Sequence, residues 1–430
     1  MAKHTYLVTV GSLTPDGAGR ALSKDEIILV HGALPNEIVR ARTFKKKSKI
    51  HHAIAVEILE GNPVRTIPKC PHFGVCSGCN LQHMPENYQL GFKEATLQAL
   101  MQKECLDSNK PLKVIKENSF NYRLKARFGL KWVVKKNKVV IGFRERGNRF
   151  ITDTYCCPIL HKRLEYVVFK LPQLIQTTSI KDAIPQVEVV TDEKVVAIII
   201  RHLKPFNLDD MRKIQCFSKI YKIDFYLQSG GVETITPVGS VNDMSYIVAN
   251  CKIKYYPYSF IQINKKINIH LVTTVLKELQ LDSNDCVIDF FCGIGNFSIP
   301  IAKQAKKVLG FEYDSNMLEL AEENAGENLC KNVSFSKQDL SKVFLIDKLN
   351  SLKGFNKIVL DPPRSGAASL ISQLNFNEVN TLVYVSCNAK TLVSDAKILV
   401  SSFGFNLKKT ILLDMFPQTS HFETVMVFKK

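Results

Sequence analysis

The sequence lacks the features that mark membrane, secreted and repetitive proteins. No apolar run approaches the roughly 20 residues that a helix needs to cross a bilayer. The segment Met1–Val10 has neither the charged stretch nor the long apolar stretch of a signal peptide. No internal repeat or low-complexity segment is visible. These absences predict a soluble cytoplasmic protein with no membrane partner, and we also expect a monomer.

Acidic residues are scarce relative to basic ones, and the imbalance is confined to one part of the chain. Residues 1–260 contain 39 Lys and Arg against 23 Asp and Glu, a net charge of +16, whereas residues 261–430 have a net charge of +2. Binding to a phosphate backbone needs clustered Lys and Arg. The division therefore predicts a nucleic-acid-binding part followed by a nearly neutral catalytic part. A merely soluble basic surface is the alternative.

The first 60 residues have the pattern of a small β-barrel. Short apolar runs separated by turn residues predict strands at residues 6–10, 27–30, 37–42 and 53–58. Five or so short strands are typical of an oligonucleotide-binding barrel. We expect the Lys45–Lys49 segment to form a basic turn where an RNA backbone could be held.

Cysteines are numerous, at 12, and without a secretion signal they indicate thiols, metal ligands or catalysis rather than disulfides. Cys70, Cys76 and Cys79 lie within ten residues and predict a metal site. The fourth ligand could be Cys105, Cys156 or Cys157, and the Cys157-Pro158 pair is typical of an iron–sulfur site. Four thiolates would suit zinc equally well. The residues alone do not separate the two metals.

Basic and aromatic residues alternate in the segment between these cysteines. Residues 88–102 have a helical pattern, and residues 121–128 alternate basic with apolar side chains at the period of a strand. The stretch Gly142–Arg149 adds three arginines. Arginines interleaved with aromatic rings suit an RNA backbone with unstacked bases.

The last 170 residues have the pattern of an open α/β sheet with a ligand site at one edge. Four strand-like runs end in polar or glycine-rich clusters, within residues 287–296, 307–312, 357–364 and 381–388. Because ligands bind at the carboxyl ends of such strands, the four ends predict one crevice. Cys387 directly follows the last strand and is the predicted nucleophile. The alternative is a small buried thiol with no chemical role.

A nucleoside cofactor is expected in this crevice. Gly293 and Gly295 allow a close backbone turn, Glu312 ends the next strand where it could accept two ribose hydroxyls, and Asp339 closes a third strand near the base. The third glycine of the dinucleotide-binding pattern is missing, because Phe297 and Ser298 follow Asn296. The pattern favours a cofactor without pyrophosphate, namely S-adenosylmethionine.

Taken together, the motifs resemble the bacterial RNA 5-methyluridine methyltransferases. They are Asp289-Phe-Phe-Cys-Gly-Ile-Gly-Asn-Phe297, Asp361-Pro-Pro-Arg-Ser-Gly366, Ser386-Cys-Asn388, His421-Phe-Glu423 and the cysteine cluster. The resemblance is closest to the member type that has a TRAM barrel and a [4Fe-4S] cluster and acts on 23S ribosomal RNA. It implies a TRAM-like OB barrel at 1–62, a mixed α+β RNA-binding domain with the cluster at 63–257, and a Rossmann-like α/β methyltransferase domain at 258–430.

The resemblance also implies roles for individual residues. The nucleophile and the base would be Cys387 and Glu423; the base would remove a proton after Cys387 has added to the uracil ring. The cofactor positions would be Gln262, Phe291, Asn296, Glu312, Asp339 and Asp361, and the cluster ligands would be Cys70, Cys76, Cys79 and Cys157. Two positions depart from the family, which usually has proline at Ala389 and a smaller aliphatic residue at Phe422.

Two other functions share some of these features. A transfer-RNA uridine-5-methyltransferase would have the same Cys and Glu pair but should lack the barrel and the cysteine cluster. A non-catalytic RNA-binding iron–sulfur protein would explain the basic first part alone. An adenine amino-group methyltransferase would need an aromatic residue at Arg364, which argues against it.

Overall fold

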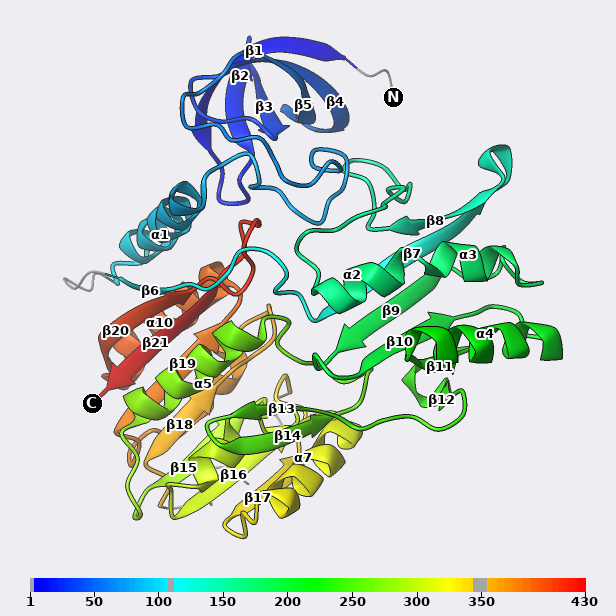
Figure 1. Ribbon diagram of the computed structural model, residues 1–430. Helices are drawn as coiled ribbons and strands as arrows, with labels where there is room; N and C mark the ends of the chain where they lie inside the picture. The colour runs from blue at the N-terminus through cyan, green and yellow to red at the C-terminus, as the bar shows by residue number, and fades with distance from the viewer. Residues whose placement is uncertain (1–3, 107–111, 343–353) are drawn as a thin grey trace. The chain divides into compact units, whose positions relative to one another are not determined.

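The computed structural model describes residues 4–106, 112–342 and 354–430, and the chain divides into two compact units (Figure 1). The first unit contains Met1–Phe92, Asn118–Asn242 and Pro417–Ser420. The second contains Lys93–Glu117, Asp243–Phe416 and His421–Lys430. No helix in the described ranges is long and apolar enough to span a lipid bilayer.

A closed five-stranded barrel begins the first unit, as the sequence predicted. Its strands are β1 (Thr5–Leu13), β2 (Gly19–Ser23), β3 (Glu26–His31), β4 (Ile38–Lys47) and β5 (Ile50–Glu60), in the order β1-β2-β3-β5-β4. Alternate residues such as Val10, Ile28 and Val39 point inward and are fully buried. β4 continues through Lys47, so the segment predicted as a basic turn is mostly strand, because it pairs with β5 up to that residue.

The rest of the first unit is a mixed α+β domain around a six-stranded sheet. Residues 61–85 form turns and loops that lead to α1 (Glu86–Lys103). The sheet has the order β12-β11-β10-β9-β7-β8. Its strands are β7 (Lys125–Val133), β8 (Lys138–Gly142), β9 (Gln186–Thr191), β10 (Val196–Arg201), β11 (Asp224–Gln228) and β12 (Ile235–Pro237), with helices α2 (Lys162–Val168), α3 (Leu171–Gln176) and α4 (Leu208–Tyr221).

The predicted alternation before and along β7 is confirmed. Ala126 and Phe128 are buried, whereas Lys125 and Arg127 lie on the other face. Both cations pair with Glu188 on β9, each with an N–O distance of 2.8 Å. The cationic face of β7 is therefore partly neutralised by its neighbouring strand.

An eight-stranded sheet forms the core of the second unit, in the order β17-β16-β15-β18-β19-β21-β20-β6. Its strands are β6 (Lys113–Ile115), β15 (Cys286–Phe290), β16 (Lys307–Glu312), β17 (Val333–Lys337), β18 (Lys357–Leu360), β19 (Thr381–Ser386), β20 (Asn406–Leu413) and β21 (Glu423–Lys429). The unit also contains α5 (Lys265–Leu279), α6 (Ser298–Ala302), α7 (Ser315–Glu327), α9 (Ala368–Ile371), α10 (Ala389–Phe403) and the hairpin of β13 (Met244–Val248) and β14 (Cys251–Tyr255).

The strand order of this sheet reverses at β15, which defines where a ligand site should form. From β15 the chain continues outward to β16 and β17, then returns to β18 on the other side of β15. In such sheets the crevice at the carboxyl ends of the two central strands binds the ligand. The five strands β15 to β19 are parallel, and β21 is antiparallel to β19, so the beginning of β21 lies at this same edge.

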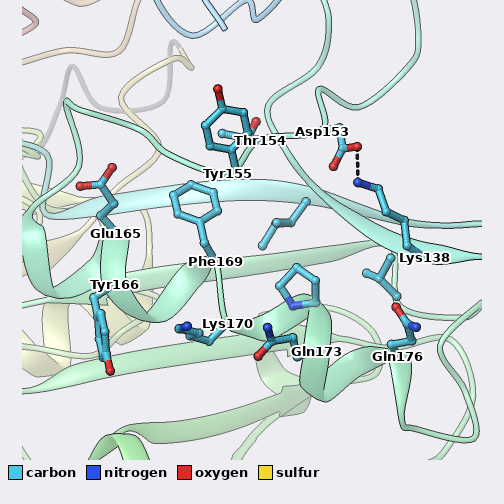
Figure 2. A pocket seen from close by; sticks show the side chains of 13 residues that line it. Lys138, Asp153, Thr154, Tyr155, Glu165, Tyr166, Phe169, Lys170, Gln173 and Gln176 are labelled. Carbon is cyan, nitrogen blue, oxygen red and sulfur yellow. Dashed lines mark ion pairs between the residues drawn. The ribbon is translucent and has the colours of Figure 1, made fainter. Parts of the chain in front are cut away.

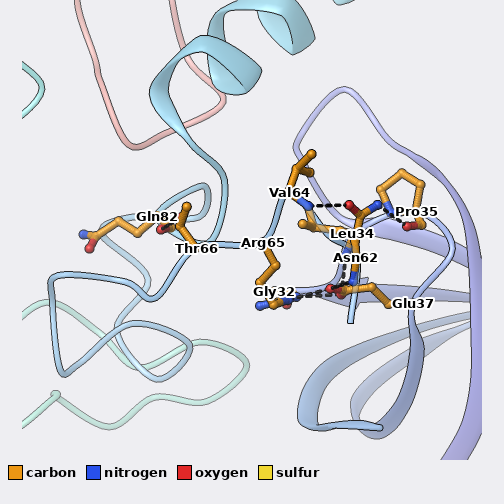
Figure 3. A network of polar contacts seen from close by, with 9 residues as sticks. All are labelled: Gly32, Leu34, Pro35, Glu37, Asn62, Val64, Arg65, Thr66 and Gln82. Atoms are coloured by element: carbon orange, nitrogen blue, oxygen red, sulfur yellow. Dashed lines mark hydrogen bonds and ion pairs between the residues drawn. The ribbon is translucent and has the colours of Figure 1, made fainter. Parts of the chain in front are cut away.

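A buried ion pair joins the barrel to the segment that follows it (Figure 3). The carboxylate of Glu37, which is fully buried, accepts two hydrogen bonds from the guanidinium of Arg65 at 2.5 and 2.6 Å. The backbone N–H groups of Leu34 and Asn62 donate to the same carboxylate. Burial alone would raise the pKa of Glu37, but these donors outweigh it and the pKa lies below its ordinary value of 4.5.

We expect Glu37→Gln to lower the free energy of unfolding by about 2 kcal/mol at pH 7, because charge-assisted hydrogen bonds are lost. The folded-state pKa is depressed, so this contribution is present above pH 4.5 and is lost as the pH falls through the lower folded value. Urea denaturation of both proteins at several pH values tests this.

Glu57→Gln is the matched control. It breaks an Arg–Glu pair of the same barrel in which both side chains are 51% exposed, and we expect little change. Equal effects of the two substitutions would contradict the importance of the buried pair.

Candidate active site

The pairing of β19 with β21 brings the two predicted catalytic residues together. The register pairs Thr381 with Lys429 and continues to Ser386 opposite Thr424. One further step along the same register places Cys387 opposite Glu423. Glu423, the first residue of β21, is 2% exposed, and the Cys387 thiol is half-buried. Two residues 36 positions apart in sequence thus lie at the same edge of the sheet.

The start of α10 holds the loop that follows β18. Asn388 caps α10 by accepting a hydrogen bond from the backbone N–H of Lys390, and its Nδ2 donates to the carbonyl of Arg364 at 2.7 Å. Asp395 lies within α10. Its carboxylate accepts hydrogen bonds from the backbone N–H of Ala367 at 2.7 Å and from the Tyr384 hydroxyl at 2.5 Å. These contacts fix the backbone of the Asp-Pro-Pro-Arg loop.

Gly366 is required at the end of this loop. Its φ is +78°, and an added Cβ would lie 2.7 Å from Oδ2 of Asp395. Any other residue would therefore displace the carboxylate that anchors the loop.

The loop places Arg364 beside the Cys387 thiol. Burial raises the pKa of Cys387, and the nearby carboxyl groups of Glu423 and Asp361 raise it further. Arg364 lies within hydrogen-bonding reach of the sulfur and lowers the pKa of Cys387 in opposition to them. The guanidinium is therefore the group that favours the thiolate at this site.

Three carboxyl groups follow one another from β21 to β15; those of Glu423 and Asp289 are buried, and that of Asp361 is half-buried. Burial raises the pKa of Glu423 well above its ordinary value; Asp361 raises it further and Arg364 lowers it. Burial and then Asp289 raise the pKa of Asp361. Desolvation likewise raises the pKa of Asp289 to about 7, and Ser298 donates to its Oδ2 at 2.5 Å. Acids with raised pKa values in one crevice are typical of a functional site.

The expected ribose position lies at the next strand end. Glu312 closes β16; its Oε2 accepts from the N–H of Gly293, and its Oε1 accepts from the N–H groups of Tyr313 and Asp314. Its charge also raises the pKa of Asp289, so the two carboxyls are neighbours. Gly293 has a φ of +55°, which allows its N–H to reach Glu312.

The remaining predicted cofactor residues occupy the surrounding loops, and their roles stay predictions. Asp339 lies beyond β17 and pairs with Lys342 at 3.0 Å. Asn296 forms a reciprocal amide pair with Asn268 and also accepts from the Tyr246 hydroxyl. Phe291 follows β15 with a φ of +65°. Gln262 is half-buried in the loop before α5.

A separate cavity in the first unit is lined by the four predicted cluster ligands, Cys70, Cys76, Cys79 and Cys157. Desolvation is the main cause that raises the pKa of all four thiols, to about 11 for Cys70 and about 12 for Cys79. Within residues 4–106, 112–342 and 354–430, no three His, Cys, Asp or Glu side chains are arranged to hold a single metal ion.

The candidates for the fourth ligand differ in position. The Cys157 thiol is affected electrostatically by all three thiols of the Cys70–Cys79 segment. Cys156 lines the same cavity but is coupled only to Cys70 among those three. Cys105 is exposed in the other unit, at the end of α1.

The sequence did not predict how Arg364 and Asp395 contribute to the site. Arg364 lowers the pKa of the Cys387 thiol, an effect that no sequence motif encodes. Asp395 anchors the loop from inside α10, and nothing in its helical surroundings distinguishes it. Asp289 was recognised only as part of a motif, yet it is fully buried and one of its oxygens lacks a hydrogen-bond partner among the described residues.

Arg364→Met should raise the pKa of Cys387, because the cation that favours the thiolate is removed. Alkylation by iodoacetamide requires the thiolate. We therefore expect alkylation of Cys387 to be several-fold slower at pH 7 and its pH profile to move to higher pH, as measured by mass spectrometry of the Cys387 peptide. Arg364→Lys, which keeps the charge, should shift the profile less. An unchanged profile in Arg364→Met would contradict this assignment.

Known proteins resemble this chain along almost its whole length. A sequence model described as tRNA (Uracil-5-)-methyltransferase matches residues 86–430. A protein of Vesicomyosocius okutanii named 23S rRNA (uracil(1939)-C(5))-methyltransferase RlmD is 38% identical over 99% of this chain and 98% of its own. A protein of the same name from Legionella pneumophila (strain Paris) is 36% identical over 97% of this chain and 96% of its own.

A solved structure has the same fold. The tRNA (uracil-54, C5)-methyltransferase of Pyrococcus abyssi, in complex with S-adenosyl-L-homocysteine, superimposes with a TM-score of 0.77 over 98% of this chain and 99% of that chain, at 24% identity. The barrel, the mixed domain and the Rossmann-like sheet are thus confirmed as a known combination. The family match and the two relatives at 36% and 38% identity show that this chain belongs to the tRNA (uracil-5-)-methyltransferase family of RNA-modifying enzymes.

Proposed function

We propose that this protein transfers a methyl group from S-adenosylmethionine to carbon 5 of a uridine in 23S ribosomal RNA. The observation that carries the proposal is the position of Cys387 opposite Glu423 at one strand end, beside Arg364 and Asp361. The names of the relatives support the ribosomal substrate, and position 1939 in those names is the uridine to examine first. A cytoplasmic monomer remains our expectation.

The chemistry explains why a thiol and a carboxylate are both needed. Carbon 5 of uracil is too weak a nucleophile to take a methyl group directly. The Cys387 thiolate adds to carbon 6, and the electron pair moves into the ring as an enolate that is nucleophilic at carbon 5. After carbon 5 is methylated, Glu423 removes the hydrogen from that carbon, and the electron pair expels the Cys387 thiolate. Cys387 is then a free thiolate and Glu423 is protonated. The cycle can restart once the Glu423 carboxyl loses its proton.

The raised pKa of Glu423 suits the role of a base, because a carboxylate with a higher pKa takes up a proton more readily. Arg364 opposes the effect of burial and of the carboxyl groups on the thiol, although the pKa of Cys387 remains above its ordinary value. The Asp361 carboxyl interacts electrostatically with Asp289, Cys387 and Glu423, and we assign it to the uracil edge. The target base must leave its stack to reach these groups.

When bound, S-adenosylmethionine supplies a methyl group on a positively charged sulfur. We propose that Glu312 accepts hydrogen bonds from its ribose hydroxyls, since this carboxylate is held at a strand end by backbone donors. Asp339 would lie near the base, and Gln262, Phe291, Asn296 and Asp361 would line the rest of the site. Asn296 already uses its amide in a pair with Asn268, so its contribution would be through this pair or its backbone.

A basic groove in the first unit supports binding of an RNA backbone. It has a volume of about 620 Å³ and is lined by side chains of the barrel and of the 146–148 loop. Arg42, Lys45, Lys46 and Arg146 line it together with Phe44, and none of the described residues that line it is acidic. Arg146 is held in place by contacts with His31 and the carbonyl of Cys79. We retain 1–62, 63–257 and 258–430 as the proposed functional segments.

We also propose a [4Fe-4S] cluster held by Cys70, Cys76, Cys79 and Cys157. The donor set fits, because the four thiols line one cavity and their charges interact with one another. Cys156 is the weaker candidate for the fourth position, since it is coupled to Cys70 alone. The reaction at uracil transfers no net electrons, so the cluster would organise the first unit rather than change its redox state.

Tritiated S-adenosylmethionine tests the main proposal. The protein, handled without oxygen, should label carbon 5 of uridine in 23S ribosomal RNA that lacks the modification, and should leave unmodified transfer RNA unlabelled. Label in transfer RNA alone would favour a transfer-RNA substrate, which the family description also allows. RNA binding without any label would favour the non-catalytic alternative.

Substituting each catalytic residue should stop the reaction at a different step. Cys387→Ala should abolish methylation and every covalent protein–RNA species, because it removes the thiol that is proposed to attack carbon 6. Glu423→Gln is nearly isosteric, so addition and methyl transfer should occur while proton removal stalls. A methylated adduct should then appear as a slow band on a denaturing gel, only for the glutamine variant.

If Glu423→Gln turned over at the wild-type rate and trapped no adduct, Glu423 would not be the base. Asp361, which shares the crevice, would be the next residue to substitute.

Protein purified without oxygen should be brown and contain about four irons per chain. Cys157→Ser should lower the iron content, whereas Cys105→Ser, at an exposed thiol of the other unit, should not. A colourless protein with stoichiometric zinc would overturn the cluster assignment.

A further inference from the structure

The first unit contains a second pocket that the proposed chemistry does not use (Figure 2). It has a volume of about 580 Å³ and lies between β8, the 153–155 segment, α2 and α3. Its lining includes Tyr155, Phe169, Lys138, Lys170, Gln173 and Gln176. A volume of this size is ordinary for a site that takes one small organic group. We call it the Tyr155 pocket.

Aromatic rings form one side of the Tyr155 pocket. Tyr155 is 67% exposed, and Tyr166 on α2 is 64% exposed. Phe169, which follows α2, is half-buried and lines the pocket together with Tyr155; Figure 2 labels both residues. Leaving large rings exposed in a hollow is unfavourable unless something covers them, so the rings indicate a ligand with a flat apolar face.

The pocket lining also offers hydrogen bonds and charged groups of both signs. Gln173 and Gln176 are exposed amides on α3, one turn apart, and each carries both donors and an acceptor. Two cations, Lys138 and Lys170, and two acids, Asp153 and Glu165, also line the pocket, and Lys138 pairs with Asp153 at 2.6 Å. A nucleobase has edges that match amides, a face that matches aromatic rings, and a phosphate that matches lysine.

The pocket is fixed to the wall of the four-thiol cavity. The ring of Tyr155 contacts His72 edge-on with a centroid separation of 4.5 Å, and its backbone N–H donates to Nε2 of His72. On the other side, the N–H of Cys157 donates to Oε1 of Glu165, which lines the Tyr155 pocket. The segment that carries Tyr155 is thus held in place before any ligand arrives.

We propose that the Tyr155 pocket binds one unstacked nucleotide of the RNA substrate, other than the uridine that is methylated. The inference rests on the proposed RNA-methyltransferase function and deepens it, because it assigns a second nucleotide contact to the first unit. The net charge of +16 in residues 1–260 favours RNA over a peptide or an uncharged metabolite. A second anchored nucleotide would fix the register of the RNA strand.

Tyr155→Ala tests the proposal in the full-length protein. Binding to a 23S ribosomal RNA transcript should weaken about tenfold, since stacking of one base on an aromatic ring is worth roughly 1–3 kcal/mol. The KM for that RNA should rise similarly, while kcat at saturating RNA stays unchanged. Tyr155→Phe keeps the ring and should behave as wild type. Ile220→Ala, on exposed α4, is a control outside the pocket.

A second variant protects the test against a change in the thiol cavity, because Tyr155 contacts His72. Gln173→Ala with Gln176→Ala removes the amide edge and leaves that contact intact; it should also raise KM without lowering kcat, the melting temperature or the iron content. Wild-type RNA affinity in both pocket variants would overturn the proposal. This result is also the one expected if a protein, and not RNA, covers this surface. Failure of wild-type protein to methylate any RNA would instead refute the proposed function.

Discussion

The antiparallel pairing of β21 with β19 is the constraint on which the catalytic end of the molecule depends. In a parallel sheet, successive strands present only their carboxyl ends to the ligand edge. Because β21 runs the other way, its first residue reaches that edge, and the register that pairs Ser386 with Thr424 sets Glu423 opposite Cys387. A slip of one residue would turn the carboxyl to the other face of the sheet. β20 pairs with the other edge of β21, and this second set of strand contacts makes such a slip unfavourable.

Burial has opposite consequences for the thiol and the carboxyl at this strand end. It raises the pKa of both groups, which makes Glu423 a stronger base but makes the Cys387 thiolate harder to form. Arg364 is therefore needed at this place, and its position depends on α10, whose first residues bind the Arg364 carbonyl. The pKa of Cys387 therefore depends on the loop that carries Arg364, and that loop depends on the first residues of α10.

Local patterns in the sequence were sufficient to predict the elements but not the side-chain contacts. The helical pattern of residues 88–102 predicted α1, which spans Glu86–Lys103. Apolar runs predicted where β19 ends, which is why Cys387 could be identified from sequence. The contact of Arg364 with the thiol depends on hydrogen bonds from a helix 24 residues later, and no local period encodes it.

Some features of the first unit were also not predicted from local sequence patterns. β2 is short, begins with Gly19 and pairs with β3 over five residues, so its pattern was too weak to predict. The contacts of Arg146 were not predicted either: it lines the basic groove while its guanidinium bonds to His31 and the carbonyl of Cys79. The Tyr155 pocket has no sequence motif, because its lining comes from four separate segments.

The two departures from the family pattern have local structural consequences that the site tolerates. Ala389 is the first residue of α10, where proline would only pre-set φ and where the missing N–H would go unused. Alanine restricts the unfolded chain less than proline does, which lowers the free energy of unfolding by about 0.4–1 kcal/mol. Asn388 still caps the helix and binds the carbonyl of Arg364. Phe422 is 6% exposed and packs in the core of the second unit. The residue directly before Glu423 is thus held in the core, and the backbone that carries Glu423 starts from a buried position.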